Sequence, residues 1–75
     1  MQEANRPITR ILRRKEVETR TGLSRSSIYA YVKNGTFPSP VRLGPNSIGW
    51  IQEDVDAWIS AKCEASRRDS RQLLN

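Results

Sequence analysis

The clearest pattern of apolar and polar positions lies in the C-terminal third of the chain. Five residues there follow the i, i+4, i+7, i+8 and i+11 spacing of one face of an α-helix: Ile51, Val55, Trp58, Ile59 and Lys62. Carboxylates at Glu53, Asp54 and Asp56 come near the start of this stripe, where they suit the positive end of a helix dipole. The pattern predicts a helix that begins near Gln52. Beyond Cys63 the chain is charged and polar, so the helix either continues or frays there.

Residues 14–21 predict a first, shorter helix of about two turns. Its Arg, Lys and Glu residues propagate helices well, and Val17 is its one clear apolar anchor. Glu16 and Arg20 stand four residues apart, in the order that favours a surface ion pair. Gly22 is expected to end this helix, because glycine accepts the left-handed conformation that is common just past a helix end.

A second short helix is predicted between Ser24, a good N-cap, and Gly35, which ends it. Leu23 before the cap and Ile28 at the fourth helical position form a hydrophobic staple. At about 100° per residue, this helix has an apolar face and an opposite face of small and polar residues. The apolar face holds Ile28, Tyr31 and Val32, and the opposite face holds Ser26, Ala30 and Lys33, with Ser27 and Asn34 at its edge and Arg25 and Tyr29 on the flank.

Prolines and glycines shape the middle of the chain. The segment 37–40 contains two prolines and cannot be helical. Two short apolar-alternating runs, 41–43 and 48–50, flank a Gly/Pro/Asn/Ser turn at 44–47, which predicts a small β-hairpin. Residues 11–12 are expected to be extended and to pack inward.

The predicted order is therefore helix, turn, helix, hairpin, helix. This is a mostly α fold with a small β-hairpin, a winged helix-turn-helix. We expect the domain to span residues 11–62, between a disordered N-terminal arm at 1–10 and a polar, basic tail at 63–75. The expected core residues are Leu12, Val17, Leu23, Ile28, Tyr31, Val32, Phe37, Val41, Leu43, Ile48, Trp50, Val55, Trp58 and Ile59.

The charge of the chain is uneven. The 75 residues carry a net charge of +5 and are 36% apolar, which allows one domain with a thin core. Residues 1–50 hold nine Lys or Arg against three acids, whereas residues 51–75 hold four against five. The first two thirds of the chain are thus the part that can face a polyanion. On charge alone, a basic surface without a function fits equally well.

The sequence lacks the motifs and residue pairs that would indicate an enzyme. There is no histidine, no glycine-rich phosphate loop and no nucleophile–base pair around Cys63, so we expect neither an enzyme nor a cofactor. The lone cysteine has no disulfide partner and, without histidine, no zinc site is expected. A free thiol fits the cytoplasm.

The sequence has no run near the roughly 20 apolar residues of a membrane span and no secretory signal over residues 1–7, so a cytoplasmic protein without a membrane partner is expected.

Several segments in unbroken order across residues 11–62 resemble one known family. They are Leu12-Arg13-Arg14-Lys15-Glu16-Val17, Thr21-Gly22-Leu23-Ser24-Arg25-Ser26-Ser27-Ile28-Tyr29, Gly35-Thr36-Phe37-Pro38, Leu43-Gly44-Pro45, Gly49-Trp50 and Val55-Asp56-Ala57-Trp58-Ile59. At this spacing the chain resembles the AlpA family of phage-type transcriptional regulators. The resemblance implies a winged helix-turn-helix related to MerR-type and excisionase DNA-binding domains, in a small prophage or mobile-element regulator of bacterial or phage origin. Such proteins commonly activate or repress phage genes, and some influence excision of the element.

The chain departs from this family at two positions. Members often carry a basic residue at the hairpin tip, where this chain has Asn46, and a long basic or polar residue on the second helix, where this chain has Ala30. The first departure weakens the expected grip of the wing on phosphate. The second leaves a small base-reading surface, so DNA preference is expected to rest on few contacts.

The candidate DNA contacts come from three parts of the predicted fold. They are Arg13, Arg14 and Lys15 around the start of the first helix; Arg25, Ser26, Ser27, Tyr29, Ala30, Lys33 and Asn34 on the second helix; and Arg42, Asn46 and Ser47 on the hairpin. Cations and hydroxyls suit phosphate, small residues at a helix N-terminus allow close approach, and Ala30 can touch a thymine methyl. For each the structural alternative stays open: a solvated charge, a helix-start serine or a boundary aromatic. Trp50 and Trp58 are expected in the core rather than as stacking platforms for bases.

The expected partner is double-stranded DNA. One module of this size buries only about 600–1,000 Å² on DNA, so high specificity is expected to need a homodimer, cooperative binding on repeated sites, or a partner protein. Two alternatives stay open. One is an excisionase-like factor that bends DNA and contacts a recombinase; the other is a protein-interaction module that does not bind DNA.

Overall fold

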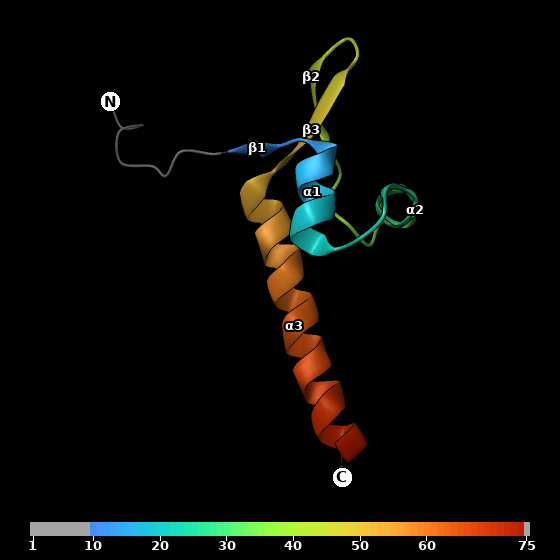
Figure 1. The fold of residues 1–75 in the computed structure, drawn as a ribbon, viewed down its shortest axis with the longest axis vertical. Coiled ribbons are helices and arrows are strands. Elements are labelled where there is room, and N and C mark those ends of the chain that lie inside the picture. The colour runs from blue at the N-terminus through green and yellow to red at the C-terminus, as the bar shows by residue number, and fades with distance from the viewer. Residues whose placement is uncertain (1–9, 75) are drawn as a thin grey trace, which may run out of the picture.

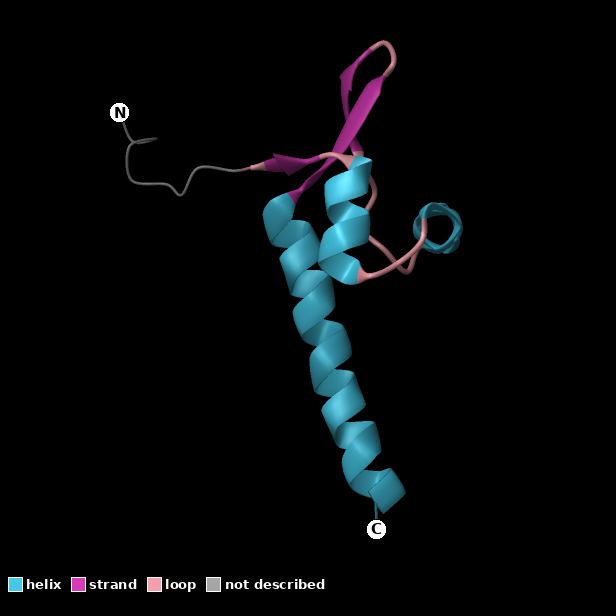
Figure 2. Ribbon diagram, viewed as in Figure 1, coloured by secondary structure: helices cyan, strands magenta, loops and turns pink. Residues whose placement is uncertain are grey.

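The computed structural model describes residues 10–74 and the side chains of residues 10–69. Its elements in chain order are β1 (Ile11–Leu12), α1 (Arg14–Thr21), α2 (Arg25–Asn34), β2 (Val41–Gly44), β3 (Ser47–Ile51) and α3 (Gln52–Leu74). Figures 1 and 2 show α1 beside α3, α2 seen along its axis to one side, and the β2–β3 hairpin projecting at the end opposite the C-terminus. This is the predicted winged helix-turn-helix. The predicted N-terminal arm lies, apart from Arg10, outside the described residues.

Local hydrogen bonds set the ends of α1 and α2. Gly22 takes a left-handed conformation with φ of 78°, and its N–H donates to the Glu18 carbonyl at 2.7 Å. The Ser24 hydroxyl accepts from the Ser27 N–H at 3.1 Å as an N-cap, and Gly35 closes α2 with the same φ. The predicted boundaries of both helices are confirmed. Together α1 and α2 form a helix-turn-helix joined by a short, hydrogen-bonded turn.

β3 is the central strand of a three-stranded antiparallel sheet with the order β1-β3-β2. Leu12 of β1 lies opposite Trp50, and Val41 of β2 lies opposite Gly49. Gly49 is buried, and a β-carbon at this position would lie 3.1 Å from the Leu12 carbonyl oxygen and would overlap the side chain of Ile11. The close approach of β1 therefore requires a glycine in the middle of the central strand.

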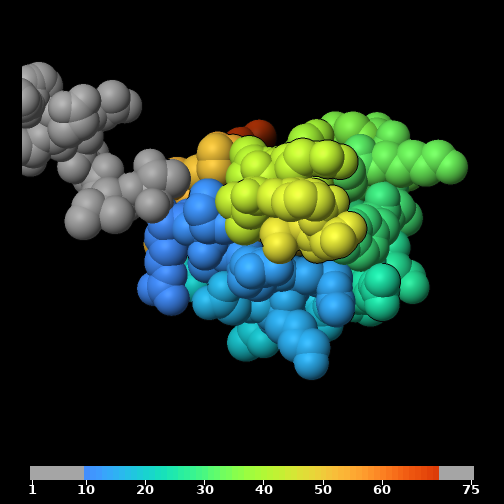
Figure 3. Space-filling model, turned by 90° about the horizontal axis from the view of Figure 1, so that it is seen from above, coloured from blue at the N-terminus to red at the C-terminus, as the bar shows by residue number. Residues whose placement is uncertain are grey.

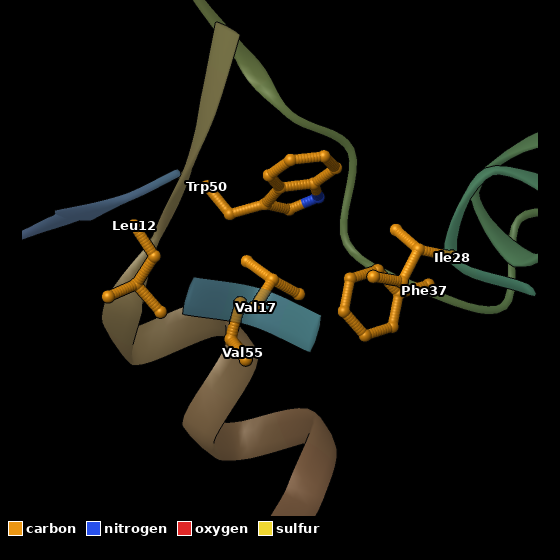
Figure 4. Packing of buried hydrophobic residues seen from close by; sticks show 6 residues of the cluster. All are labelled: Leu12, Val17, Ile28, Phe37, Trp50 and Val55. Carbon is orange, nitrogen blue, oxygen red and sulfur yellow. The ribbon is translucent and has the colours of Figure 1, made fainter. Parts of the chain in front are cut away.

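The buried core draws one side chain from almost every element. Its members, all predicted to lie there, are Leu12, Val17, Ile28, Phe37, Trp50 and Val55. Figure 4 shows them converging from β1, α1, α2, the loop before β2, β3 and α3. Trp50 is fully buried, and its indole N–H donates to the Pro38 carbonyl oxygen at 2.8 Å. The one polar group of the Trp50 side chain thus has a hydrogen-bond partner, which offsets the free-energy cost of burying an N–H group.

Two residues predicted for the core are exposed instead. Tyr31 is 38% exposed, because Ile28 and Val32 already fill the inner face of α2 and the tyrosine lies on its flank. Leu43 is 46% exposed, because it stands on the projecting hairpin where the β2–β3 register shifts. The other predicted core residues are half-buried: Leu23, Val32, Val41, Ile48, Trp58 and Ile59.

α3 begins at Gln52, as predicted, and continues to Leu74, so the tail is helical rather than frayed. Residues 60–69 are exposed, and Figure 1 shows this part of α3 running away from the rest of the fold. At about 1.5 Å per residue the whole helix is about 34 Å long. In the described part of the chain, no helix combines the length and the apolar character that crossing a membrane requires.

One ion pair differs from the sequence prediction. Arg20 pairs with Asp56 on α3, with the guanidinium Nε 2.9 Å from Oδ1, instead of with Glu16. The Glu16 carboxylate accepts from the Arg13 backbone N–H at 2.8 Å. Because α3 passes beside α1, a carboxylate that is distant in sequence replaces the local partner. The hydrogen bond from Arg20 holds the pKa of Asp56 below its ordinary value.

The Asp56→Asn variant is expected to lose a pH-dependent part of the stability. A carboxylate whose pKa is lowered by folding stabilises the native state above its ordinary pKa, and this contribution is lost as the pH falls. The difference in unfolding free energy between wild type and variant should be present at pH 7, begin to decline near the ordinary pKa of about 4, and vanish only when the pH falls below the lowered pKa of the folded state. Urea titrations measure this difference, with Arg20→Gln as the matched variant. A difference that does not change with pH would contradict the role of the pair.

Candidate nucleic-acid interface

The outer face of α2 is free of the protein core. Ile28 is buried on the inner side. The outer and flanking side chains are exposed, as predicted: Arg25, Ser26, Tyr29, Ala30, Lys33 and Asn34. Ser26 and Ala30 have short side chains, so another molecule can come close to the helix backbone in the middle of this face. Arg25 and Lys33 supply positive charge. Such a face can approach a groove closely and place its cations beside phosphates.

Ser27 belongs to the helix cap more than to this face. It is half-buried, its N–H donates to the Ser24 hydroxyl oxygen, and its own hydroxyl oxygen accepts from Ser24 at 3.1 Å. Two polar groups of Ser27 are therefore already engaged. Ser26 is the exposed hydroxyl at the start of α2 and the better placed of the two serines to meet an external group.

A hollow of about 320 Å³ lies next to the α2 face, between the start of α1 and the hairpin. The residues that line this basic hollow are Arg13, Arg14, Lys15, Tyr29, Asn46 and Ile48. Figure 3 looks down on the hairpin and shows it (yellow) between the start of α1 (blue) and α2 (green). The fold thus gathers predicted contact residues from three separate parts of the sequence into one concave surface.

Two of the three cations around the basic hollow can meet an external anion. Arg14 is half-buried and ion-paired with Glu18, one turn further along α1. Arg13 and Lys15 are exposed, and among the described residues no carboxylate lies within ion-pair distance of either. Arg13 and Lys15 therefore give the hollow two unpaired positive charges, which suits a phosphate. The charge of Arg14 is neutralised by its ion pair with Glu18.

Tyr29 joins the basic hollow to the outer face of α2. It is 37% exposed, and its ring centroid lies 6.3 Å from that of the buried Trp50, tilted by 56°. The guanidinium carbon of Arg25 lies 5.9 Å from the same ring centroid. Contacts with an indole and with a cation restrict the ring. A phenol O–H on a restricted ring can donate to a phosphate oxygen at small entropic cost.

Two predicted hairpin contacts lie apart from the basic hollow. Arg42 is exposed and Ser47 is half-buried, but neither lines the hollow. Ile48 does line it, although the sequence pattern predicted a core role only. The alternation of side chains along a strand could have indicated this position. Ile48 points to the same side of β3 as Trp50, but it is closer to the hairpin tip, where less of the protein covers it.

An exposed helix of a helix-turn-helix, a β-hairpin wing and a basic hollow between them define a winged helix-turn-helix protein. Comparison with known proteins gives the family. The sequence profile of the family described as "Prophage CP4-57 regulatory protein (AlpA)" matches residues 10–63, and the chain belongs to this family. The matched residues include the whole interface described above.

Two relatives show how far the similarity extends. The DNA-binding transcriptional activator AlpA of Escherichia coli (strain K12) is 38% identical, over 80% of this chain and 94% of its own length. The uncharacterized protein ORF88 of Enterobacteria phage P4 is 39% identical, over 79% of this chain and 67% of its own length. No solved structure shows a significant match to the chain.

Proposed function

We propose that the protein is a sequence-specific DNA-binding transcriptional regulator of prophage or mobile-element genes. The observation that carries this proposal is the basic hollow, which meets the exposed face of α2 at Tyr29. A single ligand that is long, polyanionic and grooved can engage both surfaces at once, and double-stranded DNA has these properties.

In the proposed complex α2 lies in the major groove. Ser26 and Ala30 allow the helix to approach the bases, and the Ala30 methyl offers an apolar contact to a thymine methyl. Arg25 and Lys33, exposed along the same helix, reach the groove edges or the flanking phosphates. Base readout from so few side chains is limited, so a large share of the affinity comes from the backbone.

The basic hollow holds the sugar–phosphate backbone beside that groove. Arg13 and Lys15 contribute positive charge, and the Tyr29 O–H and the Asn46 amide contribute hydrogen-bond donors. These donors come from α1, α2 and the hairpin, so a phosphate seated among them fixes the protein relative to the helix axis of the DNA. Arg42 and Ser47, which lie outside the hollow, reach the next phosphate or the minor groove from the hairpin.

The relatives favour transcriptional regulation over the other functions that fit this fold. The Escherichia coli relative carries the name of a transcriptional activator, and the second relative is a protein of phage P4. These names support a regulator of prophage or mobile-element genes rather than a factor that acts only in excision. Promoter activity in a reporter strain that lacks a recombinase separates the two roles.

Binding to duplex DNA is expected to weaken steeply with salt. If four to six phosphates are neutralised, log K should fall against log salt concentration with a slope of roughly −4 to −5. Fluorescence anisotropy with a labelled duplex, chosen by selection from random sequences, measures the slope. No detectable affinity for duplex DNA at low ionic strength would refute the proposal.

Selection also tests the number of copies that bind. One domain of this size is expected to cover a single short site, so a specific operator should contain a repeat or a palindrome and bind two copies. A footprint of one half-site with full affinity would contradict this expectation.

A further inference from the structure

A second hollow lies on the opposite flank of α2, between this helix and α3. It measures about 350 Å³ and is lined by Leu23, Tyr31, Thr36, Trp58 and Lys62. We propose that this aromatic groove binds a short segment of a partner protein in which an apolar side chain stands beside a carboxylate. The protein would then contact a second macromolecule through a surface separate from the α2 face and the basic hollow.

The aromatic side chains of the groove are held in place before any partner arrives. The Trp58 indole N–H donates to the Thr36 carbonyl oxygen at 2.7 Å, and the Trp58 ring packs edge-on against the buried Phe37 with centroids 4.9 Å apart. Tyr31 lies across from it, with ring centroids 6.5 Å apart, and is 38% exposed. The groove is thus a preformed apolar surface, which lowers the entropic cost of binding.

Charge defines the partner further. Lys62 is the only charged residue among those that line the groove. Its ammonium nitrogen lies 5.5 Å from the Trp58 ring centroid, and among the described residues no carboxylate is within ion-pair distance of it. An apolar side chain packed onto the two rings would place its neighbours beside this cation, where a carboxylate is attracted and a cation is repelled.

The size of the groove fits side chains rather than a whole helix. A volume of about 350 Å³ is near the small end of the range of about 300–1,000 Å³ seen for small-ligand sites. One or two apolar side chains of an extended or turn-forming segment fill such a space. Affinity for a short peptide is expected to be modest for the same reason.

A second copy of the chain fits the groove poorly. The most exposed large hydrophobic side chain among the described residues is Leu43 on the hairpin, at 46%, and its neighbour Arg42 is an exposed cation. Docking Leu43 onto the two rings would bring the like charges of Arg42 and Lys62 towards each other. Complementary charge therefore favours an acidic partner over self-association.

The groove also stays open when the outer face of α2 is occupied. Successive residues of an α-helix are rotated by about 100°, which places Tyr31 about 160° from Lys33 around α2. A partner in the groove and a duplex on the outer face would thus lie on different sides of one helix. Binding of a partner segment to the groove can therefore be measured in the absence of DNA. The result of that experiment does not depend on whether the protein binds DNA.

The two indole N–H groups of the chain give a direct readout. The probe is an acetylated peptide, Asp-Asp-Leu-Phe-Asp, titrated into the uniformly ¹⁵N-labelled full chain and followed by ¹H–¹⁵N correlation spectra. We expect the Trp58 indole signal to shift saturably and the Trp50 indole signal, which is buried and bonded to Pro38, to stay in place. Lys62→Glu is expected to weaken binding about five- to tenfold, because charge reversal replaces attraction by repulsion. Lys33→Glu, on the outer face, is the matched control and should bind as wild type does.

Several results would overturn the proposal. One is the absence of a saturable shift at millimolar peptide. Another is equal binding of Lys-Lys-Leu-Phe-Lys, in which lysines replace the aspartates and the apolar pair is unchanged. Equal shifts of both indoles would show unspecific binding, and a Trp58 signal that moves with protein concentration alone would assign the groove to a second copy.

Discussion

Replacing Trp50 by alanine is expected to lower the free energy of unfolding by about 3–5 kcal/mol. Trp50 lies opposite Leu12 of β1, and its fully buried indole packs against Tyr29 and donates a hydrogen bond to the Pro38 carbonyl oxygen. The described core has only six buried apolar residues. A small domain with so thin a core has a total stability of only a few kcal/mol, so the variant should be largely unfolded at 25 °C. Far-UV circular dichroism and thermal melting measure the loss.

Trp50→Phe is the matched variant for this experiment. It keeps most of the apolar volume and loses the hydrogen bond to Pro38, so a smaller loss of about 1–2 kcal/mol is expected. A melting temperature of Trp50→Ala within a few degrees of that of wild type would contradict the conclusion that burial of Trp50 is central to the stability of the core.

The combined replacement of Arg25, Tyr29 and Lys33 by alanine is expected to lower the affinity for duplex DNA about 100-fold. Each change removes one proposed contact worth about 1 kcal/mol, and the total corresponds to two powers of ten. All three side chains are exposed and alanine propagates helices well, so the fold should remain intact. Because two cations are lost, the salt slope should become shallower by about 2.

The chain offers a control with the same residue types. Tyr31, Lys62 and Arg67 are one tyrosine and two cations on the other flank of α2 and on α3, and all three are exposed. Their combined replacement by alanine changes the net charge by the same amount and should alter DNA affinity by no more than about twofold, since screening limits the effect of remote charges. Equal losses for both triple variants would show that net charge, and not the face of α2, controls binding. Anisotropy titrations at one salt concentration, with circular dichroism as the check on folding, compare the three proteins.

The elements that local chemistry determines could be predicted from the sequence. Gly22 ends α1, and Ser24 and Gly35 set the two ends of α2, because caps and left-handed glycines depend on neighbouring residues only. The six buried residues were also predicted: Val17, Ile28, Trp50 and Val55 stand at apolar positions of a helix or hairpin pattern, whereas Leu12 and Phe37 are large apolar residues in an extended segment and a loop. The family followed from the same motifs.

Features that depend on contacts between elements distant in sequence could not be predicted from the sequence pattern. Tyr31 has the periodicity of a core residue, but α3 passes at a distance that leaves a groove beside it. The pairing of Arg20 with Asp56 depends on how α1 and α3 lie together, which no local pattern contains. The contact residues were predicted as three separate groups, and only the fold joins the start of α1, Tyr29 and Asn46 in one hollow.

α3 combines an anchored half and a free half in one continuous helix. Val55 holds the first half in the core, while residues 60–69 are exposed and gain nothing from tertiary packing. An isolated stretch of this length is only marginally helical in water. Amide hydrogens in the free half therefore exchange by fraying, whereas those around Val55 exchange only when the domain unfolds as a unit. A reporter dye attached at the exposed Cys63 would lie within the free half and could follow its unwinding without disturbing the anchored half.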